Sequence, residues 1–131
     1  MKGYYVPTPH EESLATKIVQ CAHVVHTTLG PGLLEAVYER CFCYELEKRD
    51  ICHARQVSVP LVYDWIKLPW GMRLDALVDG RVICELKAVE ALTPVYVAQV
   101  LTQLKLAELH LGFLINFNVR VIKDGIRGII R

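Results

Sequence analysis

The sequence lacks the features that mark several special classes of protein. It has no apolar run long enough to span a bilayer, and no apolar stretch near its start of the kind that directs secretion. It has no repeats and no low-complexity linker, and 15 basic against 14 acidic residues leave a formal net charge of only +1. We therefore expect one domain over residues 1–131, in the cytoplasm and with no membrane partner. Binding to a polyanion would depend on local clusters of basic residues.

The cysteines also lack a recognisable pattern. There are five, an odd number, and no two are spaced as C-x-x-C, although zinc sites usually show such paired ligands. We interpret them as reduced, buried residues that bind no metal. The alternative is that Cys41, Cys43 and Cys52 form half of a metal site. Apolar residues, in contrast, make up 53% of the chain, enough for a packed core and for self-association into a homo-oligomer.

Apolar residues at helical spacing predict three helices. Thr8 and Glu11 can form a capping box at the start of the first, and the G-P-G motif at 30–32 ends it. A glycine at position 112 is expected to end the third. The predicted helices cover residues 9–29, 33–50 and 93–111.

Alternating or continuous apolar residues predict the strands, and a D-G dipeptide at 79–80 indicates a tight hairpin between two of them. Residues 64–71 are interpreted as a turn or an irregular strand, and a final hairpin or strand extension is expected near the end of the chain. The expected strands cover residues 57–63, 72–78, 81–88, 113–117, 119–122 and 126–130. With the last two ranges counted as one hairpin or strand extension, the resulting order is α-α-β-β-β-α-β-β.

Three charged residues, Asp75, Glu85 and Lys87, occupy predicted strands on either side of the D-G turn. A two-residue loop at this turn would set Asp75 and Glu85 on opposite faces of the sheet. A three-residue loop over 78–80 instead pairs Asp75 with Ile83 and places the three charged residues on one face. The apolar residues of the two strands then share the other face: Leu74, Ala76, Val82, Cys84 and Leu86. We prefer the three-residue loop because it separates charged from apolar side chains.

The charged face has a clear chemical use. Two carboxylates a few ångströms apart bind a hard divalent cation such as Mg²⁺, or Mn²⁺, through oxygen. The cation lowers the pKa of a bound water and stabilises charge on a phosphate oxygen. Lys87 can orient that water or contact the phosphate. The alternative is a structural salt bridge between Lys87 and one of the two carboxylates.

Four short motifs follow one another along the chain: Gly32-Leu33-Leu34-Glu35-Ala36-Val37-Tyr38, Arg73-Leu74-Asp75, Cys84-Glu85-Leu86-Lys87-Ala88-Val89 and Leu114-Ile115-Asn116-Phe117. In this order they resemble the motifs of the GxxExxY family of small PD-(D/E)XK proteins. The resemblance implies an α/β fold of the restriction-endonuclease-like type, with a mixed central sheet flanked by helices. It also implies a Mg²⁺- or Mn²⁺-dependent nuclease that hydrolyses nucleic acid, with DNA ahead of RNA as the substrate.

The resemblance implies a role for each candidate residue. Asp75 and Glu85 would be the main metal ligands, Glu35 a further carboxylate of the metal site, and Lys87 the catalytic lysine. Gln99 matches the glutamine of a Q-x-x-x-Y motif, whose tyrosine is replaced here by Gln103. One rival is a catalytically inactive module with the same fold that binds nucleic acid or protein. Another is a homo-oligomeric structural subunit, indicated by the two tryptophans and the apolar composition.

Overall fold

The computed structural model of the protein describes residues 3–131. Its elements, in chain order, are three α-helices, five strands and one 3₁₀ helix: α1 (Pro9–Leu29), α2 (Glu35–Lys48), β1 (His53–Tyr63), β2 (Ile66–Val78), β3 (Val82–Lys87), α3 (Pro94–Ala107), β4 (Leu111–Asn116), η1 (Ile122–Gly125) and β5 (Ile126–Ile130).

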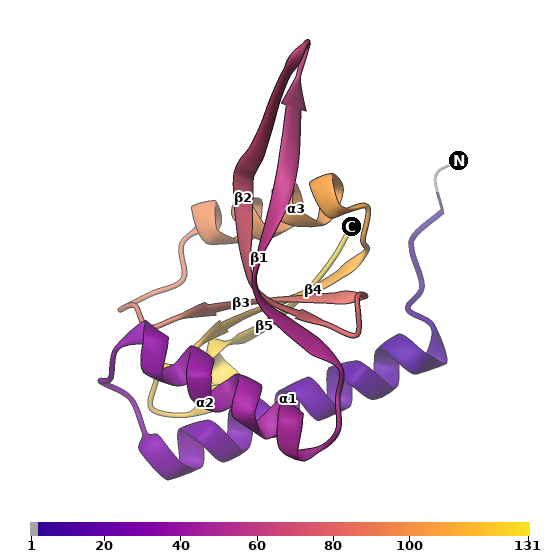
Figure 1. The fold of residues 1–131 in the computed structure, drawn as a ribbon. Helices are drawn as coiled ribbons and strands as arrows, with labels where there is room; N and C mark the ends of the chain where they lie inside the picture. Colours follow the sequence, from indigo (N-terminus) through magenta and orange to yellow (C-terminus); the bar gives the residue numbers. More distant parts are fainter. Residues whose placement is uncertain (1–2) are drawn as a thin grey trace.

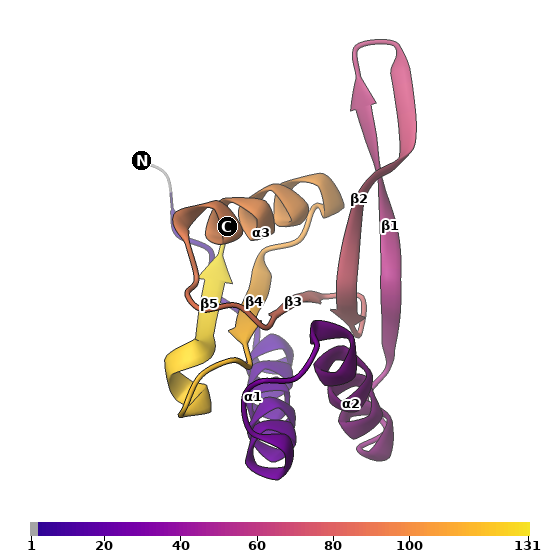
Figure 2. The ribbon, with the colours of Figure 1, turned by 90° about the vertical axis from the view of Figure 1, so that its left-hand side faces the viewer.

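The five strands form one mixed sheet in the order β1-β2-β3-β4-β5. The β3–β4 pair is parallel, and the other three pairs are antiparallel. The chain crosses from β3 to β4 through α3, as a parallel connection requires. Helices α1 and α2 lie on one side of the sheet and α3 on the other (Figures 1 and 2). The prediction of a mixed central sheet flanked by helices is therefore confirmed.

Each face of the sheet has its own hydrophobic core. On the α1–α2 side, Ile18, Phe42 and Leu46 pack with strand residues such as Cys84 and Ile115. On the α3 side, the core includes Ile83, Val100, Leu104, Leu114 and Ile129. Both faces of β3 and β4 are covered, which explains why these strands are apolar almost throughout.

The predicted helix starts are largely confirmed. The side chain of Thr8 accepts a hydrogen bond from the Glu11 N–H, and the Thr8 N–H donates one to the Glu11 carboxylate, so the capping box at α1 is complete. The third helix, however, ends at Ala107 and not at Gly112, because Glu108 adopts a left-handed conformation with φ of 56°. Gly112 lies within β4, where a Cβ would come 3.0 Å from the Val100 side chain on α3. The glycine permits close helix–sheet packing there rather than ending a helix.

Of the two alternatives for residues 64–71, the irregular strand is found for most of the segment, whereas the strand predicted at residues 119–122 is wrong. Residues 64–71 form a turn only at 64–65, and the remainder belongs to β2, so β1 and β2 make a long hairpin that projects from the body of the molecule (Figures 1 and 2). Residues 119–122 form no strand, and η1 leads instead into β5. Across residues 3–131, no helix combines the length and the apolar character that crossing a membrane would demand.

Candidate metal and catalytic site

The β2–β3 turn determines which side chains meet. The strands pair Val78 with Val82 and Ala76 with Cys84, so the loop between them has three residues, 79–81. The predicted odd loop length is confirmed, but the loop lies one residue later than predicted. Continuing this register sets Asp75 opposite Glu85 rather than opposite Ile83. Asp79 and Gly80 both have positive φ, of 52° and 63°, a conformation that Asp and Gly tolerate well.

The face assignment is correct except at one residue. Ala76, Val82, Cys84 and Leu86 lie in the α1–α2 core as predicted. Leu74 does not, because it packs in the α3-side core. The neighbouring strand is irregular at this point: Gln56 has φ of 50° and lies between the residues that pair with Leu74 and Ala76. The sharp twist of the hairpin there turns Leu74 toward the opposite face.

Asp75 is held at the point where the β2–β3 ladder stops. Its Oδ2 accepts a hydrogen bond from the backbone N–H of Leu86 at 2.9 Å. The last paired residues of the two strands are Ala76 and Cys84. Beyond this pair, the Leu86 N–H of β3 donates to the Asp75 carboxylate instead of to a backbone carbonyl of β2. The side chain is therefore fixed across the strand that carries Glu85 and Lys87.

Glu85 is almost fully buried, with 6% of its surface exposed. Its Oε2 accepts a hydrogen bond from Nε2 of Gln103 at 2.6 Å, and its Oε1 lies 3.9 Å from Nζ of Lys87. Burial and, to a smaller extent, the neighbouring Asp75 carboxyl raise the pKa of Glu85, Gln103 and Lys87 lower it, and the net result is a pKa of about 8. The buried Glu85 carboxyl group is thus the one of the pair whose ionisation is opposed by its surroundings.

Lys87 completes this face of β3. Its Nζ also lies over the ring of Tyr96 on α3, 4.8 Å from the ring centroid, and its side chain is only 17% exposed. A cation above an aromatic ring is attracted by the electron-rich face of the ring. Tyr96 and Glu85 together fix the ammonium group beside the carboxylate pair.

Glu35 approaches from the start of α2. Partial desolvation raises its pKa, Lys87 lowers it, and the Asp75 and Glu39 carboxylates raise it further. The effects of Lys87 and Asp75 show that Glu35 lies within the electrostatic field of the Asp75–Glu85–Lys87 group. Glu35 itself is exposed, however, so its carboxylate is free to move toward or away from that group.

The loop before α2 explains the G-x-x-E-x-x-Y spacing. Gly32 has φ of 99°, a conformation that favours glycine. The Tyr38 hydroxyl donates a hydrogen bond to the Gly30 carbonyl at 2.6 Å and accepts one from the Leu33 N–H at 3.1 Å. The Tyr38 ring stacks on Phe117 with centroids 4.7 Å apart. The tyrosine therefore anchors, from one helical turn away, the loop that sets where α2 and Glu35 begin.

Helix α3 supplies a residue whose role the sequence did not reveal. Gln103 is 4% exposed, and while its Nε2 bonds Glu85, its Oε1 is buried with no hydrogen-bond partner. Gln99 is exposed one turn earlier. It lies about 40° around the helix from Gln103, so it borders the same face of α3 on the solvent side. The sequence signal that points to Gln103 is its place at the tyrosine position of the Q-x-x-x-Y motif.

The oxygen atoms of Asp75, Glu85 and Gln103 fit a cation that is held by few protein ligands. Within residues 3–131, no group of three or more His, Cys, Asp or Glu side chains is close enough to hold a metal ion. Mg²⁺ is commonly held by one or two carboxylates while keeping several waters, and Asp75 with Glu85 provides that pair. The unpartnered Oε1 of Gln103 is a further oxygen at hand for such a water. The residues present therefore fit Mg²⁺ or Mn²⁺, without Glu35 as a preformed third ligand.

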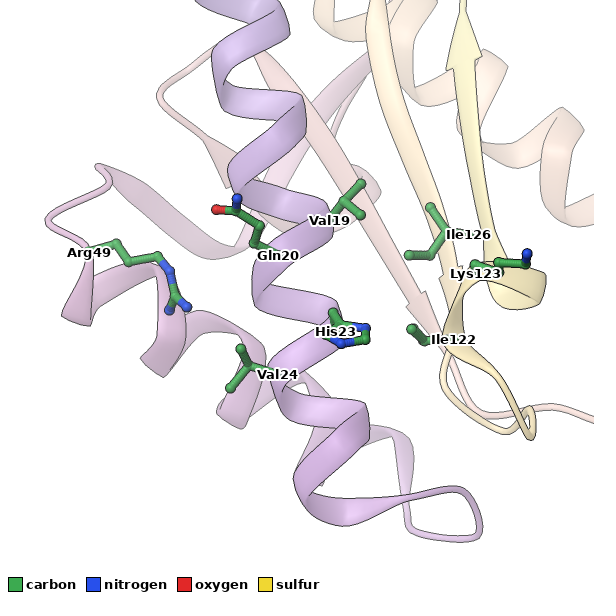
Figure 3. A pocket seen from close by; sticks show the side chains of 8 residues that line it. All are labelled: Val19, Gln20, His23, Val24, Arg49, Ile122, Lys123 and Ile126. Atoms are coloured by element: carbon green, nitrogen blue, oxygen red, sulfur yellow. The ribbon is translucent and has the colours of Figure 1, made fainter.

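The cysteines and the α1 surface lie apart from this constellation. All five cysteines are free, and burial raises the pKa of the Cys43 thiol to about 11, so it is protonated at neutral pH. A hollow of about 390 Å³ lies against α1 (Figure 3) and contains none of the candidate site residues. Its lining is Val19, Gln20, His23, Val24, Arg49, Ile122, Lys123 and Ile126.

Comparison with known proteins gives one match. A family model described as the PD-(D/E)XK nuclease superfamily matches residues 12–129. The match covers most of α1, all of α2 and α3, and the strands that carry Asp75, Glu85 and Lys87. Neither the curated proteins nor the solved structures give a match.

Proposed function

This chain belongs to the PD-(D/E)XK nuclease superfamily, and on that premise we propose that it is a divalent-metal-dependent nuclease acting through Asp75, Glu85 and Lys87. The observation that supports the proposal is that Asp75 and Lys87 both lie beside the buried Glu85 carboxyl group. Asp75 is bonded to the strand of Glu85, and the Lys87 ammonium lies 3.9 Å from the Glu85 carboxylate. A purely structural ion pair would not need the second, half-buried carboxylate.

Each residue has a distinct task in the proposed reaction. Asp75 and Glu85 bind the cation through oxygen, and Gln103 keeps Glu85 turned toward that position. When bound, Mg²⁺ or Mn²⁺ would make a water more acidic and stabilise charge on the phosphate. Lys87, held by Tyr96 and Glu85, orients the attacking water or contacts a phosphate oxygen.

The remaining site residues have supporting tasks. Glu35 is proposed as a carboxylate that approaches the cation or one of its waters once substrate is present, because it is exposed and lies in the field of Lys87 and Asp75. Gln99 is proposed as a substrate contact at the solvent border of α3. Membership of the GxxExxY family within the superfamily is likewise a proposal, supported by the Gly32, Glu35 and Tyr38 arrangement.

The proposed substrate is DNA ahead of RNA, and the proposed location is the cytoplasm. Five free cysteines, of which Cys52 is exposed rather than buried as predicted, are in keeping with a reducing compartment. Cleavage of DNA and cleavage of RNA would both require the Asp75–Glu85 carboxylate pair. A single assay can therefore test the metal dependence and rank the substrates.

The experiment incubates labelled single-stranded DNA, duplex DNA and RNA with the protein in EDTA, Mg²⁺ or Mn²⁺. Cleavage by the wild type only in the presence of a cation, and its loss in Asp75→Asn, would support the proposal. Asparagine keeps an oxygen for the Leu86 N–H, so the variant removes charge with little change in the fold. Absence of wild-type cleavage on every substrate would favour the inactive binding module instead.

A further inference from the structure

The β1–β2 hairpin extends well beyond the sheet and helices that form the body of the molecule (Figures 1 and 2). Its outer part carries the most exposed large aromatic side chains of the folded elements. Trp65 at the turn is 91% exposed, Tyr63 72% and Trp70 71%. An isolated two-stranded hairpin is only marginally stable in water, and exposed aromatic groups on it are typical of a surface that meets a partner.

The hairpin is built to present these side chains. Its tip is a two-residue turn in which Asp64 has φ of 55°. Between the Val59–Met72 and Leu61–Leu68 pairs the register shifts, which leaves Trp70 in an irregular stretch of β2. Such bulges re-aim side chains away from the regular pleat. A Cβ on Gly71 would overlap the Leu61 side chain, so the strands approach closely beside Trp70 and glycine is required there.

The position of the hairpin connects it to the candidate site. Strand β2 runs without interruption from the tip to Asp75. Ten residues separate Trp65 from Asp75, or about 33 Å of extended strand, which is comparable to about ten nucleotides of stacked strand. A nucleic acid held at Asp75 and Glu85 can therefore reach the tip of the same hairpin.

The charge of the hairpin favours an anionic partner. Between Val57 and Arg73 there are two cationic side chains, Lys67 and Arg73, and one anionic side chain, Asp64. Arg73 shares a strand with Asp75, two residues before it, and is exposed. Two cations thus lie along the path between the tip and the carboxylate pair, where phosphate groups would pass.

A strand from a second copy of the protein is a less favoured partner for the hairpin. β1 is an edge strand, and Pro60 in its outer half has no N–H to donate. The ladder is also irregular at this point. Proline and bulges on an edge strand are devices that prevent pairing with another chain.

We propose that the β1–β2 hairpin is a nucleic-acid-binding arm, in which Trp65 and Trp70 stack on unpaired bases while Arg73 and Lys67 contact the backbone. The inference rests on the proposed function, because it names the form of nucleic acid that the site would receive. Aromatic stacking on bases is tolerant of sequence. The arm therefore selects strands with unstacked bases over intact duplexes without reading a particular sequence.

Tryptophan fluorescence reports directly on this arm, because Trp65 and Trp70 are the only two tryptophans in the chain. The wild-type protein is titrated in EDTA, where no cation-dependent cleavage occurs, with a single-stranded oligonucleotide and with a blunt duplex of the same sequence. We expect saturable quenching and protection from acrylamide with the single strand, and a weaker effect with the duplex. Saturable binding that leaves the tryptophan emission unchanged would place the nucleic acid elsewhere and overturn the proposal, as would absence of binding.

Variants complete the test. By anisotropy of a labelled single strand, Trp65→Ala/Trp70→Ala should bind about tenfold or more weakly. Tyr4→Ala, which removes a 97% exposed aromatic outside the hairpin, should bind as the wild type does. Equal binding by the double variant would overturn the proposal. So would a wild-type dimer by light scattering that becomes monomeric in the double variant, since a second copy would then cover the hairpin.

The two proposals fail in different ways. If the arm is wrong and the nuclease right, the double variant cleaves single strands in Mn²⁺ as fast as the wild type. If the nuclease is wrong and the arm right, no cleavage occurs, but quenching in EDTA persists.

Discussion

The side-chain amide of Gln103 lies 2.6 Å from the carboxylate of Glu85, with Nε2 donating to Oε2. This bond joins α3 to the central strand of the candidate site, and both partners are buried. It favours the ionised form of Glu85 against burial and against the Asp75 carboxyl. The helix thereby adjusts the carboxylate that we propose as a metal ligand.

Replacing Gln103 by methionine should weaken metal binding more than it weakens the fold. Methionine fills a similar volume but donates no hydrogen bond, so the pKa of Glu85 rises and protons compete more strongly with the cation. We expect the Mn²⁺ concentration needed for half-maximal cleavage to rise several-fold, and the effect to shrink as the pH is raised. Gln99→Met, an exposed glutamine on the same helix, is the matched control. An equal loss at every pH would indicate general damage to the site instead.

The metal-free protein should lose stability as the pH rises. Glu85 has a pKa near 8 in the folded chain, well above its ordinary value near 4.5, so the folded state binds the proton more tightly than the unfolded state does. The associated stability is full below about pH 4.5 and is lost as the pH rises through about 8, at no more than about 1.4 kcal/mol per pH unit. Urea unfolding in EDTA between pH 5 and 9 measures this slope. Glu85→Gln, which cannot ionise, should flatten it, and an unchanged slope in that variant would contradict the assignment.

Divalent cations should stabilise the protein through the carboxylate pair. Millimolar Mn²⁺ at pH 8 should raise the Tm of the wild type by several degrees, since a ligand at 100 times its Kd contributes about 2.7 kcal/mol. Asp75→Asn should abolish the shift and, because it removes one of two repelling charges, slightly raise the Tm of the metal-free protein. Glu90→Gln, an exposed carboxylate beyond the end of β3, serves as the control. A shift that survives in Asp75→Asn would place the cation elsewhere.

Tyr38→Phe should destabilise the fold by about 1–2 kcal/mol. The substitution keeps the ring that stacks on Phe117 but removes the hydroxyl that holds the Gly30 carbonyl and the Leu33 N–H. Both backbone groups belong to the loop that leads into α2. Tyr44→Phe on the same helix, where the side chain is exposed, should change the free energy of unfolding by less than about 0.5 kcal/mol. Similar values for the two variants would show that the Tyr38 hydroxyl does not anchor the loop.

The sequence allowed the local geometry of β2 and β3 to be predicted where the turn and the pattern of apolar residues determine it. The D-G turn and the separation of charged from apolar residues were sufficient to predict an odd loop and a common face for Asp75, Glu85 and Lys87. The position of the loop was wrong by one residue, because shifting a three-residue loop by one position keeps every side chain on the same face. Parity alone therefore cannot distinguish an Asp75–Ile83 pair from an Asp75–Glu85 pair.

Features that depend on distant contacts were not predictable in this way. The inward orientation of Gln103 depends on how α3 packs across β3, which leaves the apolar Leu101 of the same helix 38% exposed. The reorientation of Leu74 depends on the irregular backbone at Gln56 in the neighbouring strand. The length of the β1–β2 hairpin was underestimated because proline and glycine in residues 64–71 are typical of turns, whereas here they lie at a bulge and a close approach between strands.

The most direct test of the proposed nuclease is single-turnover cleavage of labelled single-stranded DNA in Mn²⁺ by the wild type, Lys87→Ala and Lys105→Ala. Lys105 is an exposed lysine on α3 and controls for the loss of a positive charge. We predict that Lys87→Ala cleaves about 100-fold or more slowly while keeping the Mn²⁺-induced rise in Tm, and that Lys105→Ala cleaves nearly as fast as the wild type. Equal cleavage by the wild type and Lys87→Ala would contradict the assignment of the active site to Asp75, Glu85 and Lys87.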